Sequence, residues 1–90
     1  MLFMIVEKFK NRDPKPIFRR FLEKDRMLTD GLVYKESWIE ANFERCFQLM
    51  ECDDISLLQE WILEWHDLAE FEIIPVAESK KTSELVKKFL

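Results

Sequence analysis

The sequence predicts an α+β fold in which one antiparallel sheet carries two helices on the same face. The chain of 90 residues is long enough for one domain with a modest core. Its hydrophobic fraction of 48%, with three Trp, one Tyr and eight Phe, argues against disorder. Most directly, strand-like and helix-like apolar spacings follow one another along the chain in the order β-α-β-β-α-β.

The first strand and the first helix are predicted within residues 2 to 24. An apolar run rich in strand-forming residues covers residues 2 to 9. Asp13 is placed to cap a following helix, and Pro14 fits its first turn, where a missing backbone N–H costs nothing. The apolar residues of this helix then recur at helical spacing, at Ile17, Phe18, Phe21 and Leu22.

A hairpin is predicted for the middle of the chain. The turn Thr29-Asp30-Gly31 leads into a strand at residues 32 to 39, and residues 41 to 44 connect it to a strand at residues 45 to 51. Strict alternation divides the first of these strands between two faces, with Tyr34, Glu36 and Trp38 on one and Val33, Lys35, Ser37 and Ile39 on the other.

A second helix, a fourth strand and a C-terminal helix complete the chain. Asp53 or Asp54 caps a helix with i, i+3, i+4, i+7 apolar spacing, at Leu58, Trp61, Ile62 and Trp65. Residues 71 to 76 form a strand that Pro75 confines to an edge, and residues 82 to 90 form a short amphipathic helix. Two crossovers around one hairpin define a ferredoxin-like sandwich, assigned to residues 1–78, with residues 79–90 as the C-terminal helical segment.

Charged and aromatic residues have a distinctive spacing where the second helix leads into the fourth strand. Residues 60 to 76 follow the pattern E-W-x-x-E-W-x-D-L-x-E-F-E-[IV]-x-P-V. With Trp38 and the junction at residues 50 to 54, this segment resembles a bacterial family of small domains of unknown function with the dimeric α/β-barrel fold. The resemblance covers residues 2 to 77 and implies a ferredoxin-like homodimer related in fold to muconolactone isomerases and cofactor-free monooxygenases. It implies no reaction, because kinship of fold does not transfer chemistry.

The composition excludes several classes of site. Gly31 is the only glycine, so the chain has neither a glycine-rich phosphate loop nor a Gly-x-Ser-x-Gly nucleophile elbow. One histidine and two cysteines are too few for an ordinary structural zinc site with four Cys/His ligands. A metal at His66, Asp67 and Glu70 would have a single nitrogen ligand. We therefore expect neither a metal nor a bound cofactor.

The cysteines and the apolar segments bear on location. Cys46 and Cys52 are separated by about 20 Å of extended chain, too far for a disulfide, which favours reduced thiols. The apolar run at residues 2 to 6 is too short for a signal sequence, and no stretch reaches the roughly 18 apolar residues of a membrane span. These observations predict a cytoplasmic protein without a membrane partner.

Trp61 and Trp65 lie one turn apart on the helix face that must meet the sheet. One interpretation is core packing by two large amphipathic rings. The other is a small-molecule pocket between helix and sheet, with Trp38 as a third wall, so that Trp38, Trp61 and Trp65 are the candidate ligand-binding residues.

His66 is the one candidate catalytic residue, and it also has two interpretations. At the end of the second helix, a histidine complements the helix dipole as a cation. At the rim of a pocket, the same ring would serve as a general acid–base group, with Asp67 or Glu70 orienting it.

Charge is unevenly distributed along this chain of net charge −4. Residues 8 to 26 hold eight basic and three acidic side chains, whereas residues 36 to 78 hold twelve acidic and one basic. This division fits solvated faces and complementarity between two copies. The alternative is a single-strand RNA platform, since the fold is shared with the RNA recognition motif, but residues 45 to 51 lack the glycine and aromatic pattern of that motif. We expect no nucleic acid as partner.

Both faces of the predicted sheet are apolar, which predicts an obligate homodimer packed sheet against sheet. Two helices can cover only one face, and the uncovered apolar face would exceed what soluble monomers usually expose. The same face of a second copy would cover it in one isologous contact. Either Leu2, Met4 and Val6 or Phe3 and Ile5 would face the partner, and the sequence leaves the choice open.

Two hypotheses for function follow. The first is a cofactor-free barrel that binds a small, largely apolar molecule in a Trp-lined pocket and exchanges a proton with it. The second is a non-enzymatic homodimeric interaction module with a filled core. Because the same apolar residues fill a core or line a cavity, the sequence does not choose between them.

Overall fold

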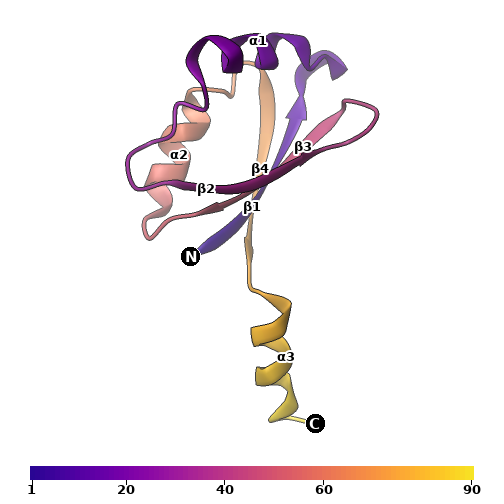
Figure 1. The fold of residues 1–90 in the computed structure, drawn as a ribbon, viewed down its shortest axis with the longest axis vertical. Helices are drawn as coiled ribbons and strands as arrows, with labels where there is room; N and C mark the ends of the chain where they lie inside the picture. The colour runs from indigo at the N-terminus through magenta and orange to yellow at the C-terminus, as the bar shows by residue number, and fades with distance from the viewer.

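The computed structural model describes residues 1–90 and has the predicted order of strands and helices (Figure 1). Its four strands form one antiparallel sheet in the order β2-β3-β1-β4. This order is compatible with a ferredoxin-like arrangement. The connection from β1 to β2 through α1 passes β3, and the connection from β3 to β4 through α2 passes β1. The strands are β1 (Leu2–Phe9), β2 (Val33–Ile39), β3 (Arg45–Glu51) and β4 (Ala69–Val76), and the helices are α1 (Lys15–Lys24), α2 (Ile55–Leu63) and α3 (Ser79–Lys87).

The predicted boundaries are confirmed for β1 and β3 and shifted elsewhere. β4 begins at Ala69, two residues earlier than expected, because Ala69 pairs with Phe9 at the end of β1. Pro75 lies in this edge strand, as its missing N–H requires. Asp54 is the cap of α2, and its side chain accepts a hydrogen bond from the Ser56 N–H at 2.9 Å.

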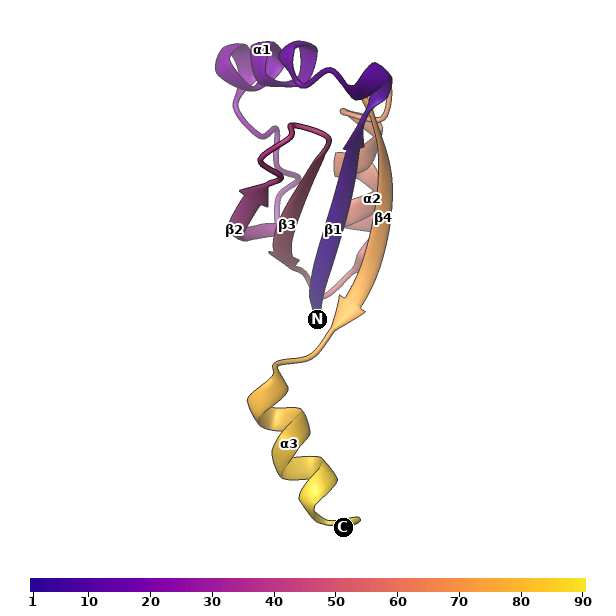
Figure 2. The same cartoon turned by 90° about the vertical axis from the view of Figure 1, so that its right-hand side faces the viewer.

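The C-terminal helix also differs from the expectation. α3 begins at Ser79 instead of residue 82, and it ends at Lys87, before the last three residues. Figures 1 and 2 show α3 projecting below the sheet, away from the rest of the chain. Its apolar side chains are accordingly exposed, with Phe89, just beyond its end, 83% accessible.

Strict alternation in β2 was a wrong prediction, because the strand contains a bulge. The register with β3 shifts between Tyr34 and Glu36, which leaves Lys35 as the extra residue. Tyr34 therefore lies on the same face as Ser37, and their hydroxyl oxygens are 2.6 Å apart in a hydrogen bond. Trp38, which pairs with Phe47, lies on the opposite face.

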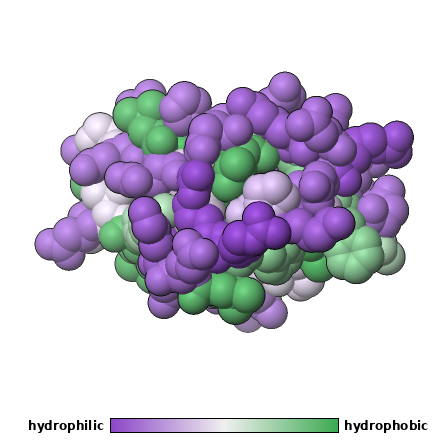
Figure 3. Space-filling model, turned by 90° about the horizontal axis from the view of Figure 1, so that it is seen from above, coloured by the Kyte–Doolittle hydropathy of each residue, from purple (hydrophilic) through white to green (hydrophobic).

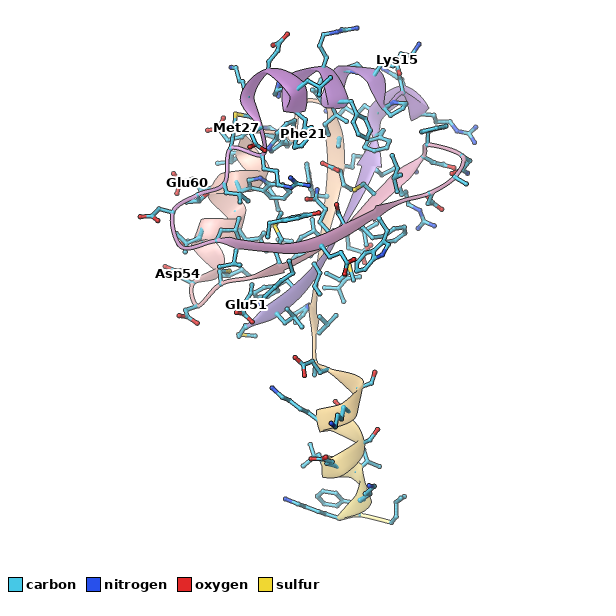
Figure 4. The ribbon with its side chains drawn as sticks, viewed as in Figure 1. Lys15, Phe21, Met27, Glu51, Asp54 and Glu60 are labelled. Atoms are coloured by element: carbon cyan, nitrogen blue, oxygen red, sulfur yellow. The ribbon has the colours of Figure 1, made fainter.

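Both α1 and α2 lie on one side of the sheet, with α1 running across its end and α2 along it (Figures 1 and 2). The first strand alternates between buried and half-buried side chains along Leu2 to Glu7. The buried side chains face the helices and join the main core, which comprises Phe3, Ile5, Phe9, Ile17, Leu32, Met50, Cys52, Leu58, Trp61, Trp65 and Ala69. Figure 4 shows Phe21 on the side of α1 toward the sheet, whereas Glu60 of α2 points outward.

The opposite face of the sheet is largely apolar and carries no helix, and its register also places Glu36, Glu51 and Glu72 on this side. Its side chains come from all four strands and include Leu2, Met4, Val6, Trp38, Phe47, Leu49, Ile74 and Val76. We call these eight residues the outer face. Trp38 and Ile74 are among the exposed large hydrophobic residues of the chain.

Replacement of Leu58 by alanine should destabilise the fold strongly. Leu58 is fully buried on the inner side of α2, so Leu58→Ala is expected to lower the free energy of unfolding by about 2–5 kcal/mol. Leu63→Ala, at the end of the same helix where the side chain is 68% exposed, should change it by less than about 0.5 kcal/mol. Urea denaturation of both variants tests this, and equal effects would contradict the packing described.

Candidate functional site

A cavity of about 220 Å³ opens between the helices and the inner face of the sheet. Most of its lining is hydrophobic, from α1, α2 and β2, and the polar lining groups are few. A mostly apolar cavity with a small number of polar groups is the usual form of a small-molecule site.

Trp61 and Trp65 form one wall of this cavity and are also part of the core. Their indole N–H groups both donate to the backbone carbonyl oxygen of Arg26, at 2.9 Å for Trp61 and 3.0 Å for Trp65. Trp61 and Trp65 therefore pack in the core and also line the cavity, so both interpretations of the sequence hold for them. Since both N–H groups have a partner, the rings offer a ligand only apolar surface.

Trp38 also borders the cavity, but its position differs from that of the other two tryptophans. Through the bulge in β2, Trp38 pairs with Phe47 and belongs to the outer face, where it is 47% exposed. The structure thus brings Trp61 and Trp65 together and leaves Trp38 at the boundary between the cavity and the outer face.

Arg26 lies in the segment between α1 and β2 and borders the cavity. Its guanidinium carbon lies 3.7 Å from the centroid of the Tyr34 ring and 5.0 Å from that of Phe21, within the range of cation–π contacts. The residues on either side have positive φ, 58° at Asp25 and 54° at Met27, which is unfavourable for residues other than glycine. This geometry turns the Arg26 carbonyl toward the two indoles.

Glu7 is a buried carboxyl group in the cavity lining, only 5% exposed. The β1 register places it opposite Cys46 and Phe71, on the face that the helices cover. Its Oε2 accepts one hydrogen bond, from Nε2 of Gln48 at 3.3 Å. Burial raises the pKa of Glu7 to about 7, and hydrogen bonds with Gln48 and Cys46 offset part of that increase. The neutral and the charged carboxyl are therefore both accessible near neutral pH.

The Cys46 thiol faces the same carboxyl group. Burial, together with the nearby Glu7 charge, raises the pKa of Cys46 to about 12. The thiol is consequently protonated at physiological pH and lacks the thiolate that nucleophilic chemistry requires. Cys46 and Cys52 are both free cysteines, as predicted.

Sequence reasoning missed Glu7 and Arg26 as site residues. A signal for Glu7 was present, because residues 3, 5, 7 and 9 share one face of β1 and Glu7 is the single charge among Phe3, Ile5 and Phe9. No comparable signal exists for Arg26, which lies among several basic residues and owes its position to two tryptophans far along the chain.

His66, the candidate catalytic residue, lies outside the cavity lining. α2 ends at Leu63, and His66 is exposed in the turn that follows. The carboxylate of Asp67 is bound by Arg20 of α1 through two hydrogen bonds of 2.8 Å, so it does not serve to orient His66. The hydrogen bonds with Arg20 lower the pKa of Asp67 to about 2. This pair ties α1 to the end of α2, above the cavity.

Figure 3 shows the surface on the α1 side of the molecule as mostly hydrophilic, with apolar patches between the charged groups. No group of three or more His, Cys, Asp or Glu side chains is arranged to hold a metal ion. None of the helices has the length and apolar character needed to cross a membrane.

Comparison with known protein families finds one match, a domain of unknown function, DUF3303, which covers residues 1–90. The chain belongs to this family. No curated protein and no solved structure matches it. For this DUF3303 domain, the function therefore has to be inferred from the cavity and from the residues around it.

The buried carboxyl of this DUF3303 domain should make its stability depend on pH. Because the pKa of folded Glu7 lies near 7, above its ordinary value of 4.5, folding favours the protonated form. Relative to Glu7→Gln, the wild type should lose unfolding free energy as the pH rises from about 4.5 to about 7, by roughly 3 kcal/mol in all, and lose no more above that range.

Urea denaturation at a series of pH values measures this difference, and the subtraction cancels the titration of the other carboxylates. Glu60→Gln, an exposed position on α2, is the matched control and should follow the wild type at every pH. Parallel curves for the wild type and Glu7→Gln would show that Glu7 is not a buried acid.

Proposed function

We propose that this DUF3303 domain binds a small, largely apolar molecule in the cavity between its helices and its sheet, without a bound cofactor. The observation that carries this proposal is the cavity of about 220 Å³ lined by Trp61, Trp65 and other apolar residues. Cavities for drug-sized ligands measure roughly 300–1,000 Å³, so the ligand is smaller, with one or two rings.

The polar groups of the cavity support binding over simple imperfect packing. Empty cavities in proteins are typically apolar, whereas Glu7, Gln48 and Arg26 are among the residues that line this one. Buried polar groups cost stability unless they have partners. Their collection around one apolar cavity is typical of a site that orients a ligand.

Glu7 also supplies the chemistry of the proton exchange envisaged for this domain. A carboxyl group whose pKa lies near 7 gives up and takes back a proton at neutral pH. Glu7 replaces His66 in this role, because His66 is exposed and does not line the cavity.

Filling the cavity should abolish binding. Ser37 borders the cavity from β2, so Ser37→Leu is expected to lower the affinity for apolar ligands at least tenfold. Ser83→Leu, the same substitution in exposed α3, should bind as the wild type does. Each compound of a panel of one- and two-ring neutral molecules is titrated into the protein while its tryptophan fluorescence is measured. Thermal melting checks that each variant is folded. Failure of every compound to bind the folded wild type would refute the proposal.

A second proposal concerns assembly, and the outer face favours it. We propose that two copies pack outer face against outer face, as a homodimeric α/β barrel. Eight apolar side chains from four strands form this face, and no helix of the same chain covers them. Lys8 pairs in register with Glu70 near one end, so charges of both signs border the apolar area. An apolar surface of this kind is covered when it packs against the same surface of a second copy in one isologous contact.

Under this second proposal, the mass in solution should be twice 11.0 kDa at micromolar concentration. Met4→Asp places a charge at the centre of the outer face and should produce aggregated or unfolded protein, because the apolar surface then loses its partner. Leu63→Asp, the same kind of substitution at an exposed apolar residue of α2 on the other side of the sheet, should remain dimeric. Light scattering coupled to size exclusion measures both, and a stable wild-type monomer would contradict the barrel.

A further inference from the structure

We propose that the ligand of this cavity is a small aromatic carboxylate, whose anion binds the Arg26 guanidinium while the Glu7 carboxyl donates a hydrogen bond to a ligand oxygen. Both side chains line the same cavity. The inference rests on the function proposed above and extends it by naming the chemical class of the ligand.

The Arg26 guanidinium is a cation without a partner anion. Two other arginines, Arg20 and Arg45, each form an ion pair with a carboxylate. Arg26 takes part in no ion pair, and its guanidinium makes no hydrogen bond within the chain, although the residue is half-buried. The rings of Phe21 and Tyr34 lie near the guanidinium and leave its N–H groups without acceptors. Guanidinium N–H groups have the geometry that binds a carboxylate through two parallel hydrogen bonds.

The backbone of Arg26 is held from several directions, so its side chain starts from a fixed point. The two indoles of Trp61 and Trp65 bind its carbonyl oxygen, and Oδ1 of Asp25 accepts from its N–H at 2.8 Å. Asp25 and Met27, on either side, have positive φ, an unfavourable conformation that persists only where the surrounding structure offsets its cost. Strain of this kind is concentrated at ligand sites, where it orients a functional group in advance.

The remaining walls select the body of the ligand. α1 contributes Ile17, Phe18 and Phe21, α2 contributes Trp61, and the turn after α2 contributes Trp65. Because the indole N–H groups are already bonded, these walls recognise an aromatic or similarly apolar body through contact alone. Carboxylate recognition then falls to Arg26, the only cation in the lining.

Glu7 makes this recognition sensitive to pH. The charged or titratable groups that face the cavity are Glu7 from β1, Cys46 from β3 and Arg26 from the α1–β2 segment, while α1 and α2 contribute apolar residues only. The pKa of Cys46 is raised to about 12, so Glu7 is the group that titrates near neutrality. A neutral Glu7 donates to the ligand, whereas a charged Glu7 repels its anion, so affinity should fall as the pH rises through about 7.

The test uses cinnamate and cinnamamide, which share one shape but differ in charge. Isothermal titration calorimetry at pH 6 should give at least tenfold tighter binding of cinnamate to the wild type. Arg26→Gln should remove this preference, since it deletes the cation and keeps the backbone contacts. Arg19→Gln, an exposed residue of α1 without an ion pair, is the matched control and should retain the preference.

The second arm compares pH 6 with pH 8. Cinnamate is ionised throughout this range, as ordinary carboxylic acids are, so a change in its affinity reports on the protein. The wild type should lose several-fold in affinity at pH 8, and Glu7→Gln, which stays neutral, should show no such loss. A loss of equal size in the variant would remove Glu7 from the proposal.

The outcomes separate this inference from the proposed function. If the amide binds as tightly as the acid, or if Arg26→Gln retains the preference, the carboxylate assignment is wrong while the cavity remains a binding site. The same holds if neutral compounds of the earlier panel bind and neither cinnamate nor cinnamamide does. If no compound of either set binds to the folded protein, both proposals fail.

Discussion

The backbone carbonyl of Arg26 accepts hydrogen bonds from two buried indoles, and the arrangement of the helices over the sheet depends on this acceptor. Without it, the N–H groups of Trp61 and Trp65 would be buried with no partner, at a cost of about 1–3 kcal/mol each. The acceptor lies in the segment that joins α1 to β2, so the same contact fixes the end of α1 against α2. Arg20 and Asp67 add a second attachment between these helices. The cavity is the space that these attachments keep open.

Glu7 shows how the interior departs from the most stable arrangement. An apolar residue between Ile5 and Phe9 would complete the inner face of β1, and a single hydrogen bond from Gln48 does not replace the water that the carboxylate loses on burial. The raised pKa is the consequence. A buried acid that weakens a small domain is understandable where it serves a ligand, because functional sites commonly oppose stability.

The two faces of the sheet have different surroundings. Helices cover the inner face and enclose the cavity, whereas the outer face consists of apolar side chains that no element of the chain covers (Figure 2). α3 lies apart from both faces, with Leu85 and Phe89 exposed. Since the cavity and the outer face are on opposite sides of the same strands, substitutions can address ligand binding and assembly separately. Trp38, which borders the cavity from the outer face, is the residue where the two meet.

The sequence by itself determined the elements and their order, because the signals for these are local. The apolar spacing in α2, the cap at Asp54 and the position of Pro75 in β4 each follow from interactions within a few residues. Only the tertiary structure decided which groups form the site. Alternation reveals that Glu7 shares a face with Ile5, but whether helices bury that face depends on contacts between distant segments. The role of Arg26 and the bulge in β2 have the same origin, since each depends on partners brought near only by folding, and local periodicity carries no information about them.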